Sequence, residues 1–308
     1  MTSSTTARPR PISKRGWVAL AVWLLVVGAA LTAVITLYNA EGGSRVATEL
    51  GASDVPGIIV TVEPVSVDST KNQATVRLAL EATGADLVDD RGRLKQNTRI
   101  QLVSFNGTNE AKYVAGDALG QFEVQVGLDG EEALYPFDRH VGIFAVTADS
   151  YVKKSDGSLE STGDISVGLQ GSGGVNGWDT TFEFDTTMVT VAQGLLRFQR
   201  AFSTQAFALV ILCSTAVLAI LALIISILVF TRRREVEAAL LSWTAALLFA
   251  LPLLRNYMPN SPPVGAAIDA YVYLWVVLAA ITATVLMVLG WNSQRRDALR
   301  AGQAEGGE

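Results

Sequence analysis

The residues best suited to chemistry stand together in one short stretch of the chain. They are Tyr135, Pro136, Phe137, Asp138, Arg139 and His140, and the stretch contains the only histidine. A histidine beside an aspartate can act as the general base of a hydrolase, but it needs a nucleophile or a bound substrate nearby, which the sequence does not supply. The alternative is a structural corner, in which Pro136 fixes the backbone, Tyr135 and Phe137 fill the core, and Asp138 caps or pairs. We favour the structural corner and therefore expect that the protein is not an enzyme.

Metal and redox chemistry find little support elsewhere in the chain. Asp86, Asp89 and Asp90 precede Arg91-Gly92-Arg93 and offer the carboxylate oxygens that calcium prefers, but they lack the spacing of a known calcium loop. The single cysteine, Cys213, lies within an apolar run, so it cannot form an intramolecular disulfide and is expected to pack as a small hydrophobic residue. We therefore expect no metal and no cofactor.

Charged residues stand at the ends of the apolar runs. Arg197 and Arg200 come just before the second run, where basic side chains reach phosphates or brace an outer domain against its helices; bracing is favoured. Arg255 and Asp269 flank a proline-rich loop and are placed to pair across it. Together with Tyr135–His140, these residues form our candidate interface between the domain and the membrane.

The composition indicates a membrane protein. Hydrophobic residues make up 50% of the chain and charged residues only 17%, with a mean hydropathy of +0.34, which is too apolar for a soluble chain. The excess lies in four runs, residues 17–38, 206–230, 238–254 and 270–291. The first run is long enough to cross a hydrocarbon core of about 30 Å, and the second is longer. The third is short and carries Pro252 near its far end, so we expect a kink there or an outer turn buried by neighbouring helices. The first run could also be a cleavable signal peptide. The length of this run and the lack of a clear Ala-x-Ala site after it favour an uncleaved signal anchor.

The basic residues predict one orientation. Those on the proposed inner side are Arg8, Arg10, Lys14, Arg15, Arg232, Arg233, Arg234, Arg295, Arg296 and Arg300, whereas only Arg255 falls in the short outer loop. The positive-inside rule then places both termini in the cytoplasm, and we expect a multi-pass plasma-membrane protein. Its expected segments are a basic tail (1–16), helix (17–38), outer domain (39–205), helices (206–230 and 238–254), outer loop (255–269), helix (270–291) and cytoplasmic tail (292–308).

The outer domain shows the alternation of antiparallel strands. Phe122, Val124 and Val126 alternate with polar residues, which gives one core face and one solvent face. Similar segments are Ile58–Val67, Ala74–Leu80, Arg99–Phe105, Gln121–Leu128, Gly142–Ala148, Ile165–Leu169 and Thr180–Asp185. Turn signals such as Asn106-Gly107 separate them. The predicted fold is a membrane protein of the α+β class, with an antiparallel β-sandwich and four transmembrane helices, one N-terminal and three C-terminal.

Charge restricts the partners of the outer domain. From Asn39 to Arg200 there are 23 acidic and 13 basic residues, so the domain repels polyanions and nucleic acid is excluded as an expected partner. An acidic surface of this kind also keeps an exposed domain soluble. The expected partners are the lipid bilayer and either an envelope protein or further copies of the chain.

Two resemblances follow from these elements. From Trp17 to Trp291, the helix order, the Tyr135-Pro136-Phe137-Asp138 motif and the loop from Met258 to Asp269 resemble a bacterial multi-pass membrane-protein family catalogued as a domain of unknown function. The aromatic-Pro-Phe-Asp loop and the Arg197–Arg200 segment are also similar to the Cys-loop pentameric ligand-gated channels, although both cysteines of that loop are absent. The second resemblance implies a β-sandwich above a channel.

Three functional hypotheses remain. The favoured one is a non-enzymatic envelope protein whose β-domain binds a ligand or partner while the helices anchor it or relay a signal. The alternative is an oligomeric channel-like protein or transport accessory subunit. The third, an envelope hydrolase using His140 and Asp138, is the least favoured.

Overall fold

The computed structural model describes Pro56–Glu305 except residues 185, 186 and 261, together with Val46–Thr48 and separate positions between Trp17 and Thr36. The chain divides into two units, Met1–Gly43 and Ser44–Glu308, which are considered separately. The described positions between Trp17 and Thr36 are helical. The remainder of the predicted first helix (17–38) and the basic tail (1–16) lie outside the described residues.

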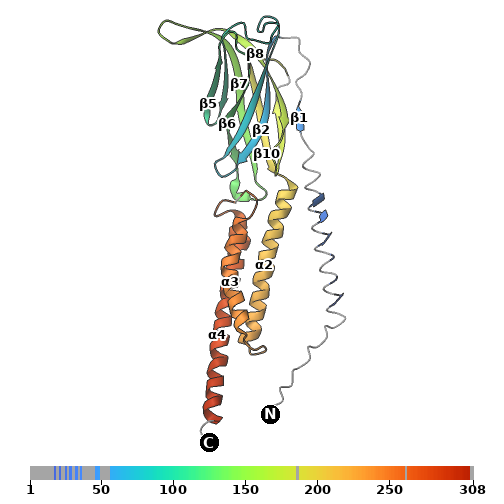
Figure 1. Ribbon diagram of the computed structural model, residues 1–308, viewed down its shortest axis with the longest axis vertical. Helices are drawn as coiled ribbons and strands as arrows, with labels where there is room; N and C mark the ends of the chain where they lie inside the picture. The colour runs from blue at the N-terminus through green and yellow to red at the C-terminus, as the bar shows by residue number, and fades with distance from the viewer. Residues whose placement is uncertain are drawn as a thin grey trace. The chain divides into compact units, whose positions relative to one another are not determined.

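Ten strands build the outer domain (Figure 1). They are β1 (Val46–Thr48), β2 (Gly57–Asp68), β3 (Gln73–Thr83), β4 (Thr98–Ser104), β5 (Gly107–Tyr113), β6 (Gln121–Gly130), β7 (Arg139–Lys153), β8 (Leu159–Gly173), β9 (Trp178–Phe184) and β10 (Val191–Arg200). A short 3₁₀ turn, η1 (Glu132–Leu134), separates β6 from β7. The expectation of a sheet-rich domain is therefore confirmed.

The sheet closes on itself, so the domain is a barrel and the predicted sandwich is not confirmed. Hydrogen-bonded neighbours run β8–β2–β3–β6–β7, and β7 pairs again with β8. The cause is the length of β7, 15 residues. One edge of β7 pairs first with β6 and then with β4, while the other edge pairs first with β10 and then with β8. A β-bulge between Ser150 and Tyr151 falls where β7 pairs with β8 and bends the strand there.

Apolar residues at every second position of the strands form the barrel core. Ile58, Val60 and Val62 of β2 and Val76 and Leu78 of β3 are fully buried in one apolar cluster. Burying an aliphatic side chain of this size contributes about 1.5–3 kcal/mol before the loss of chain entropy is counted. The core therefore holds the domain by packing, without a disulfide among the described residues.

Three strands were not predicted from the sequence. They are Val46–Thr48, Gly107–Tyr113 and Val191–Arg200. The second is almost entirely polar and forms an edge that pairs only with β4, so it lacks the apolar alternation of a half-buried strand. The third alternates correctly, but its buried positions end in Arg200 instead of an apolar residue.

Three long apolar helices follow the barrel: α2 (Phe202–Phe230), α3 (Ala238–Asn256) and α4 (Leu274–Glu305), the last preceded by a π-helical turn, η2 (Asp269–Tyr273). Among the described residues, Phe202–Phe230, Ala238–Asn256 and Asp269–Asp297 are long and apolar enough to cross a membrane. The expectation of three C-terminal apolar helices is confirmed.

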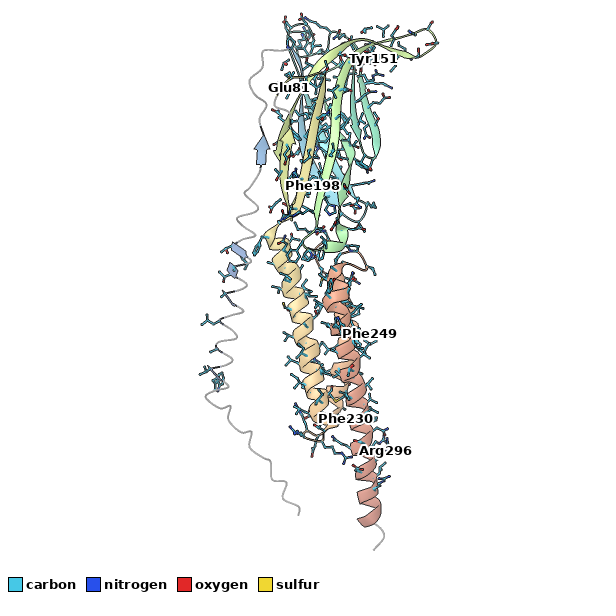
Figure 2. The ribbon with its side chains drawn as sticks, turned by 180° about the vertical axis from the view of Figure 1, so that it is seen from behind. Glu81, Tyr151, Phe198, Phe230, Phe249 and Arg296 are labelled. Carbon is cyan, nitrogen blue, oxygen red and sulfur yellow. The ribbon has the colours of Figure 1, made fainter. Side chains whose placement is uncertain are left out.

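Small residues let α2 and α4 approach closely. Ala219 and Ala222 on α2 and Ala280 and Ala283 on α4 are buried, a pattern typical of helix packing in lipid. Leu247, Leu251 and Met287 are buried as well, while many other large apolar side chains point away from the bundle. Phe249, which is 81% exposed, is visible on the outer side of α3 (Figure 2), as is typical of a helix that is apolar enough to cross a membrane.

The barrel packing predicts the effect of adding one methyl group. An alanine at Gly171 of β8 would place its Cβ 2.5 Å from the Phe182 ring, so Gly171→Ala should destabilise the barrel by about 1–3 kcal/mol. On the same strand, an alanine at Gly163 would meet only Ser150 Oγ at 3.6 Å. Gly163→Ala should therefore leave stability within about 0.5 kcal/mol. Thermal unfolding of the full chain, followed by circular dichroism, measures both; equal midpoints would contradict this packing.

Candidate functional site

The site is built around Arg200, the last residue of β10. Alternation along β10 turns Arg200 into the barrel with Leu196 and Phe198, whereas Arg197 faces outward. Only 1% of Arg200 is exposed. Ala201 alone separates this arginine from α2, so Arg200 lies where the barrel becomes the helix bundle.

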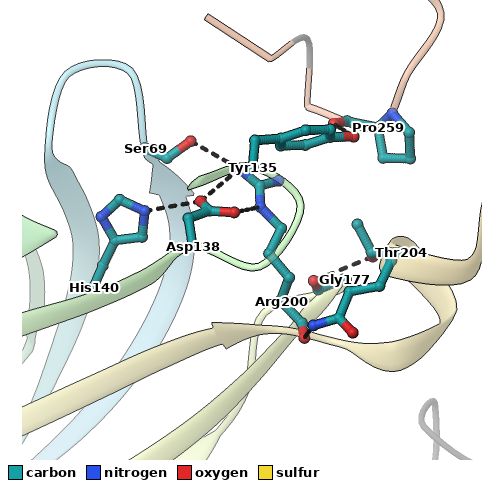
Figure 3. Close-up of polar contacts among 9 residues, drawn as sticks. Ser69, Tyr135, Asp138, His140, Gly177, Arg200, Thr204 and Pro259 are labelled. Atoms are coloured by element: carbon teal, nitrogen blue, oxygen red, sulfur yellow. Dashed lines mark hydrogen bonds and ion pairs between the residues drawn. The ribbon is translucent and has the colours of Figure 1, made fainter. Parts of the chain in front are cut away.

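Asp138 neutralises the guanidinium through two hydrogen bonds (Figure 3). Arg200 Nε donates to Asp138 Oδ1 at 2.8 Å and Nη2 donates to Oδ2 at 3.0 Å. Nη2 also donates to Ser69 Oγ at 3.0 Å, next to the end of β2. Bidentate pairing is the strongest arrangement that an arginine and a carboxylate make. It fixes both side chains in one geometry.

His140 completes the charged cluster on the strand that follows Asp138. Its Nε2 lies 3.0 Å from Asp138 Oδ2, and its ring meets the Trp178 ring edge-on with 5.6 Å between centroids. The residue is fully buried. Gly130, paired with His140 across β6 and β7, has no room for a Cβ because the imidazole and the Arg139 carbonyl occupy that position.

Two aromatic rings cover the guanidinium. Arg200 Cζ lies 4.3 Å from the centroid of the Trp178 ring and 4.8 Å from that of Tyr135. Such contacts stabilise a desolvated cation by about 2 kcal/mol. Among the described residues, Arg200 Nη1 and His140 Nδ1 have no hydrogen-bond partner. The rings therefore compensate part of the cost of leaving Nη1 without one.

Burial and charge shift two pKa values in this cluster. Burial alone would raise the pKa of Asp138, but the hydrogen bonds from His140 and Arg200 hold it below its usual value. Burial raises the pKa of Tyr135 to about 12. Asp138 is thus an anion and Tyr135 a neutral hydrogen-bond donor at physiological pH.

Tyr135 connects the cluster to the helices. Its hydroxyl donates to the Pro259 carbonyl at 3.0 Å, in the loop between α3 and α4. Its ring is buried with Ala208 and Leu212 of α2 and with Met258 of the same loop. Tyr135 therefore bonds to the loop between α3 and α4 and lies in one apolar cluster with α2. Phe137 was expected in the core, but it is 56% exposed.

A second ion pair fixes the loop that receives Tyr135. Arg255 Nε and Nη2 donate to the two oxygens of Asp269 at 3.0 and 2.6 Å. Nη2 also donates to the Pro263 carbonyl at 3.0 Å, and the Gly265 amide donates to Asp269 Oδ2 at 3.0 Å. The proline-rich loop is thus tied to the ends of α3 and η2.

The start of α2 is tied back to the barrel as well. The Ala201 amide and the Thr204 hydroxyl both donate to the Gly177 carbonyl, at 3.0 and 3.2 Å. Gln205 Nε2 donates to the Arg200 carbonyl at 3.1 Å. These bonds satisfy polar groups at a helix start that has no side-chain N-cap.

The remaining candidate residues lie away from the cluster. Arg197 pairs with Glu183 on the outer surface, and Arg139 is exposed. Asp89 accepts the amides of Arg91 and Arg93 and so closes a turn. In the described part of the chain, no group of three metal-ligating side chains comes together.

The structure adds Ser69, Trp178 and Pro259 to the site. Ser69 and Pro259 each contribute one hydrogen bond, and the Trp178 ring contacts both Arg200 and His140, as described above. No motif marks Ser69 or Trp178 in the sequence, because the barrel topology brings their segments to Arg200, whereas Pro259 lies in the predicted outer loop 255–269. The assembled site can hold the barrel and the helices in one arrangement, and its charged groups are shielded from solvent.

Removing the buried carboxylate should be costly. Asp138→Asn leaves Arg200 charged and buried without a counter-ion, and should destabilise the chain by about 3–5 kcal/mol. Glu183→Gln is the matched control, since it removes the carboxylate of the exposed Arg197–Glu183 pair and should cost less than about 1 kcal/mol. Thermal unfolding in detergent compares them. Similar losses would contradict the assigned role of Asp138.

The same pair predicts an acid dependence. Because the folded state lowers the pKa of Asp138, its contribution is fully present above the unfolded value of about 3.9 and is lost as pH falls through the lower folded value. The wild-type chain should therefore lose more stability below about pH 4 than Asp138→Asn does. Parallel pH profiles for the two proteins would refute this assignment.

Family comparisons divide the chain close to this site. Residues 48–195 match the family described as a domain of unknown function (DUF4436), and residues 200–294 match a second domain of unknown function (DUF8686). Comparison with curated proteins gives no match. Both families agree with the expected resemblance to proteins of uncharacterised function. The boundary falls within β10, so Asp138 and Arg200 belong to different matched regions.

Proposed function

We propose that this chain is a non-enzymatic plasma-membrane protein. Its barrel lies outside the membrane and binds an envelope protein, and the helix bundle anchors the barrel and relays the binding. Both termini lie in the cytoplasm in this proposal, as the distribution of basic residues indicates.

The observation that carries the relay is the continuous set of contacts through the junction. Arg200 begins the connection to α2, Asp138 holds it, and Tyr135 of the same loop bonds to Pro259 between α3 and α4. A displacement of the β6–β7 loop must therefore move the ends of all three helices or break these bonds. Coupling of this kind needs two sites joined by packed and hydrogen-bonded elements.

The outer face of the barrel supports the binding role. Val103, Ile143 and Val191 are 46%, 55% and 49% exposed, and they lie on the adjacent strands β4, β7 and β10. The strand register places Ile143 opposite the partly exposed Leu195 and Val103 opposite Ala145, and these four residues form a strip, whereas Val191 lies farther along β10, opposite Thr147. An apolar strip across three strands is unusual for a surface without a partner.

The buried state of His140 and Asp138 supports a role without catalysis. Their exposed fractions are 0% and 1%, and a general base must reach the substrate proton directly or through one water.

Site-specific photo-crosslinking in native membranes tests the binding role. A photoreactive residue at Ile143 should give one reproducible cross-linked envelope protein, whereas the same residue at Val65, exposed on β2, which pairs with β3 and β8 and with none of the three strands of the strip, should not. Cross-links only to a second copy of the chain would favour the oligomeric channel-like alternative instead. Identical product patterns at the two positions would count against the proposal.

Hydrogen exchange tests the relay. Tyr135→Phe removes only the hydroxyl that binds Pro259, so amide exchange in residues 257–268 should rise at least several-fold while the barrel strands stay protected. Tyr151→Phe, a buried tyrosine on β7, is the control and should leave that loop unchanged. Unaltered exchange in Tyr135→Phe would remove the junction as the route of coupling.

A further inference from the structure

A second cluster lies at the other end of the helices, where the turn between α2 and α3 meets α4. Gln294 of α4 joins the two segments: its Nε2 donates to the carbonyls of Val229 and Arg234 at 3.3 and 3.2 Å, and its Oε1 accepts the Val236 amide at 3.1 Å. Arg232 Nη1 lies 2.8 Å from Asp297 Oδ2. The turn is thus fixed against one stretch of α4.

The backbone of this turn is held in an unusual conformation. Arg232 has a φ of 60°, which costs a non-glycine residue about 1–2 kcal/mol. The amides of Arg233 and Arg234 both donate to the Leu228 carbonyl. At Gly290 an added Cβ would lie 2.9 Å from Val229, so the end of α2 packs tightly against α4. A fixed turn presents its side chains in a defined arrangement.

Positive charge gathers at this place. The two joined segments contain Arg232, Arg233, Arg234, Arg295 and Arg296, against the carboxylates of Glu235, Glu237 and Asp297. Arg232 is paired with Asp297, and Arg234 lies 3.9 Å from Glu237. Within the described part of the chain, no ion pair occupies the exposed Arg233, Arg295 or Arg296. Figure 2 shows Arg296 near Phe230, at the end of the bundle away from the barrel.

The length of α3 sets the depth of the cluster. Its 19 residues span about 28 Å at 1.5 Å per residue, which matches a hydrocarbon core of about 30 Å. Ala238 therefore marks one boundary of the core, and residues 231–237 lie in the adjacent headgroup layer. Arg295 Cζ lies 5.5 Å from the Trp291 ring, and tryptophan is typical of this layer.

We propose that the fixed turn 231–237 and residues 291–297 of α4 form a binding site for the headgroup of an anionic phospholipid. Arg233, Arg295 and Arg296 hold the phosphate, whose negative charge is not offset by a headgroup cation, while Trp291 lies along the glycerol and upper acyl region. Guanidinium groups match phosphate oxygens through paired donors. The site does not depend on which side of the membrane the barrel occupies.

Native mass spectrometry of the delipidated full chain in detergent tests the site. Phosphatidylglycerol is titrated against phosphatidylcholine of the same acyl chains. One arginine near an anionic lipid surface increases the affinity for that surface about five-fold. The double variant Arg233→Gln, Arg296→Gln should therefore weaken phosphatidylglycerol binding about 25-fold. Arg139→Gln with Arg197→Gln removes the same charge from the barrel surface and should change it less than two-fold.

Two further measurements test whether binding needs the fixed geometry of the turn and the lipid itself, or only the positive charge. Gln294→Leu keeps every arginine but releases the turn, and should also weaken phosphatidylglycerol binding several-fold. Inorganic phosphate at millimolar concentration should not displace the lipid. Equal affinities for the two lipids, an equal effect of the barrel-surface variant, or displacement by inorganic phosphate would each overturn the proposal.

Discussion

The junction between barrel and helices depends on one buried ion pair, Arg200 with Asp138. Desolvating the two charges costs several kcal/mol each, and the structure offsets this cost with two charge-assisted hydrogen bonds, the Ser69 hydroxyl and two aromatic rings. A hydrophobic pair would fill the same space without that cost. The ion pair additionally fixes the direction of the contact, that is, the relative orientation of the two side chains, because a bidentate contact has one geometry and apolar contacts have many.

That direction matters because the two partners come from different parts of the fold. Asp138 directly precedes β7, the strand that closes the barrel, and Arg200 ends β10 one residue before α2. Tyr135 then extends the connection to the loop that Arg255 and Asp269 hold in place. The β-domain and the helices are thus joined through a short series of directional contacts, which agrees with the proposed relay.

The sequence predicted the parts of the structure that depend on local patterns. The apolar runs identified the three C-terminal helices, and alternation identified most strands, because both are periodic in a single segment. β5 escaped prediction because it is a polar edge strand, and β10 because its last inward residue is an arginine. The barrel could not be distinguished from a sandwich, since closure depends on how one long strand, β7, divides its edges among four partners.

Local sequence patterns predicted only part of the candidate site. The Tyr135–His140 stretch is distinctive in composition, and Arg255 and Asp269 flank an obvious loop, so local sequence was sufficient to select them. Trp178 and Ser69 reach Arg200 only through the barrel topology, and nothing near them in sequence marks them. Arg197 and Arg200 looked equivalent, but their spacing of three residues places them on opposite faces of a strand.

The most direct test of the central claim is a double-mutant cycle with Arg200→Met and Asp138→Leu, read by hydrogen exchange at the start of α2 and in residues 257–268. If the buried pair holds the junction, each single variant should raise exchange in both segments, and the double variant should raise it less than the two single effects combined, because no charge is left unpaired. Strictly additive effects, or a response in only one segment, would contradict the account.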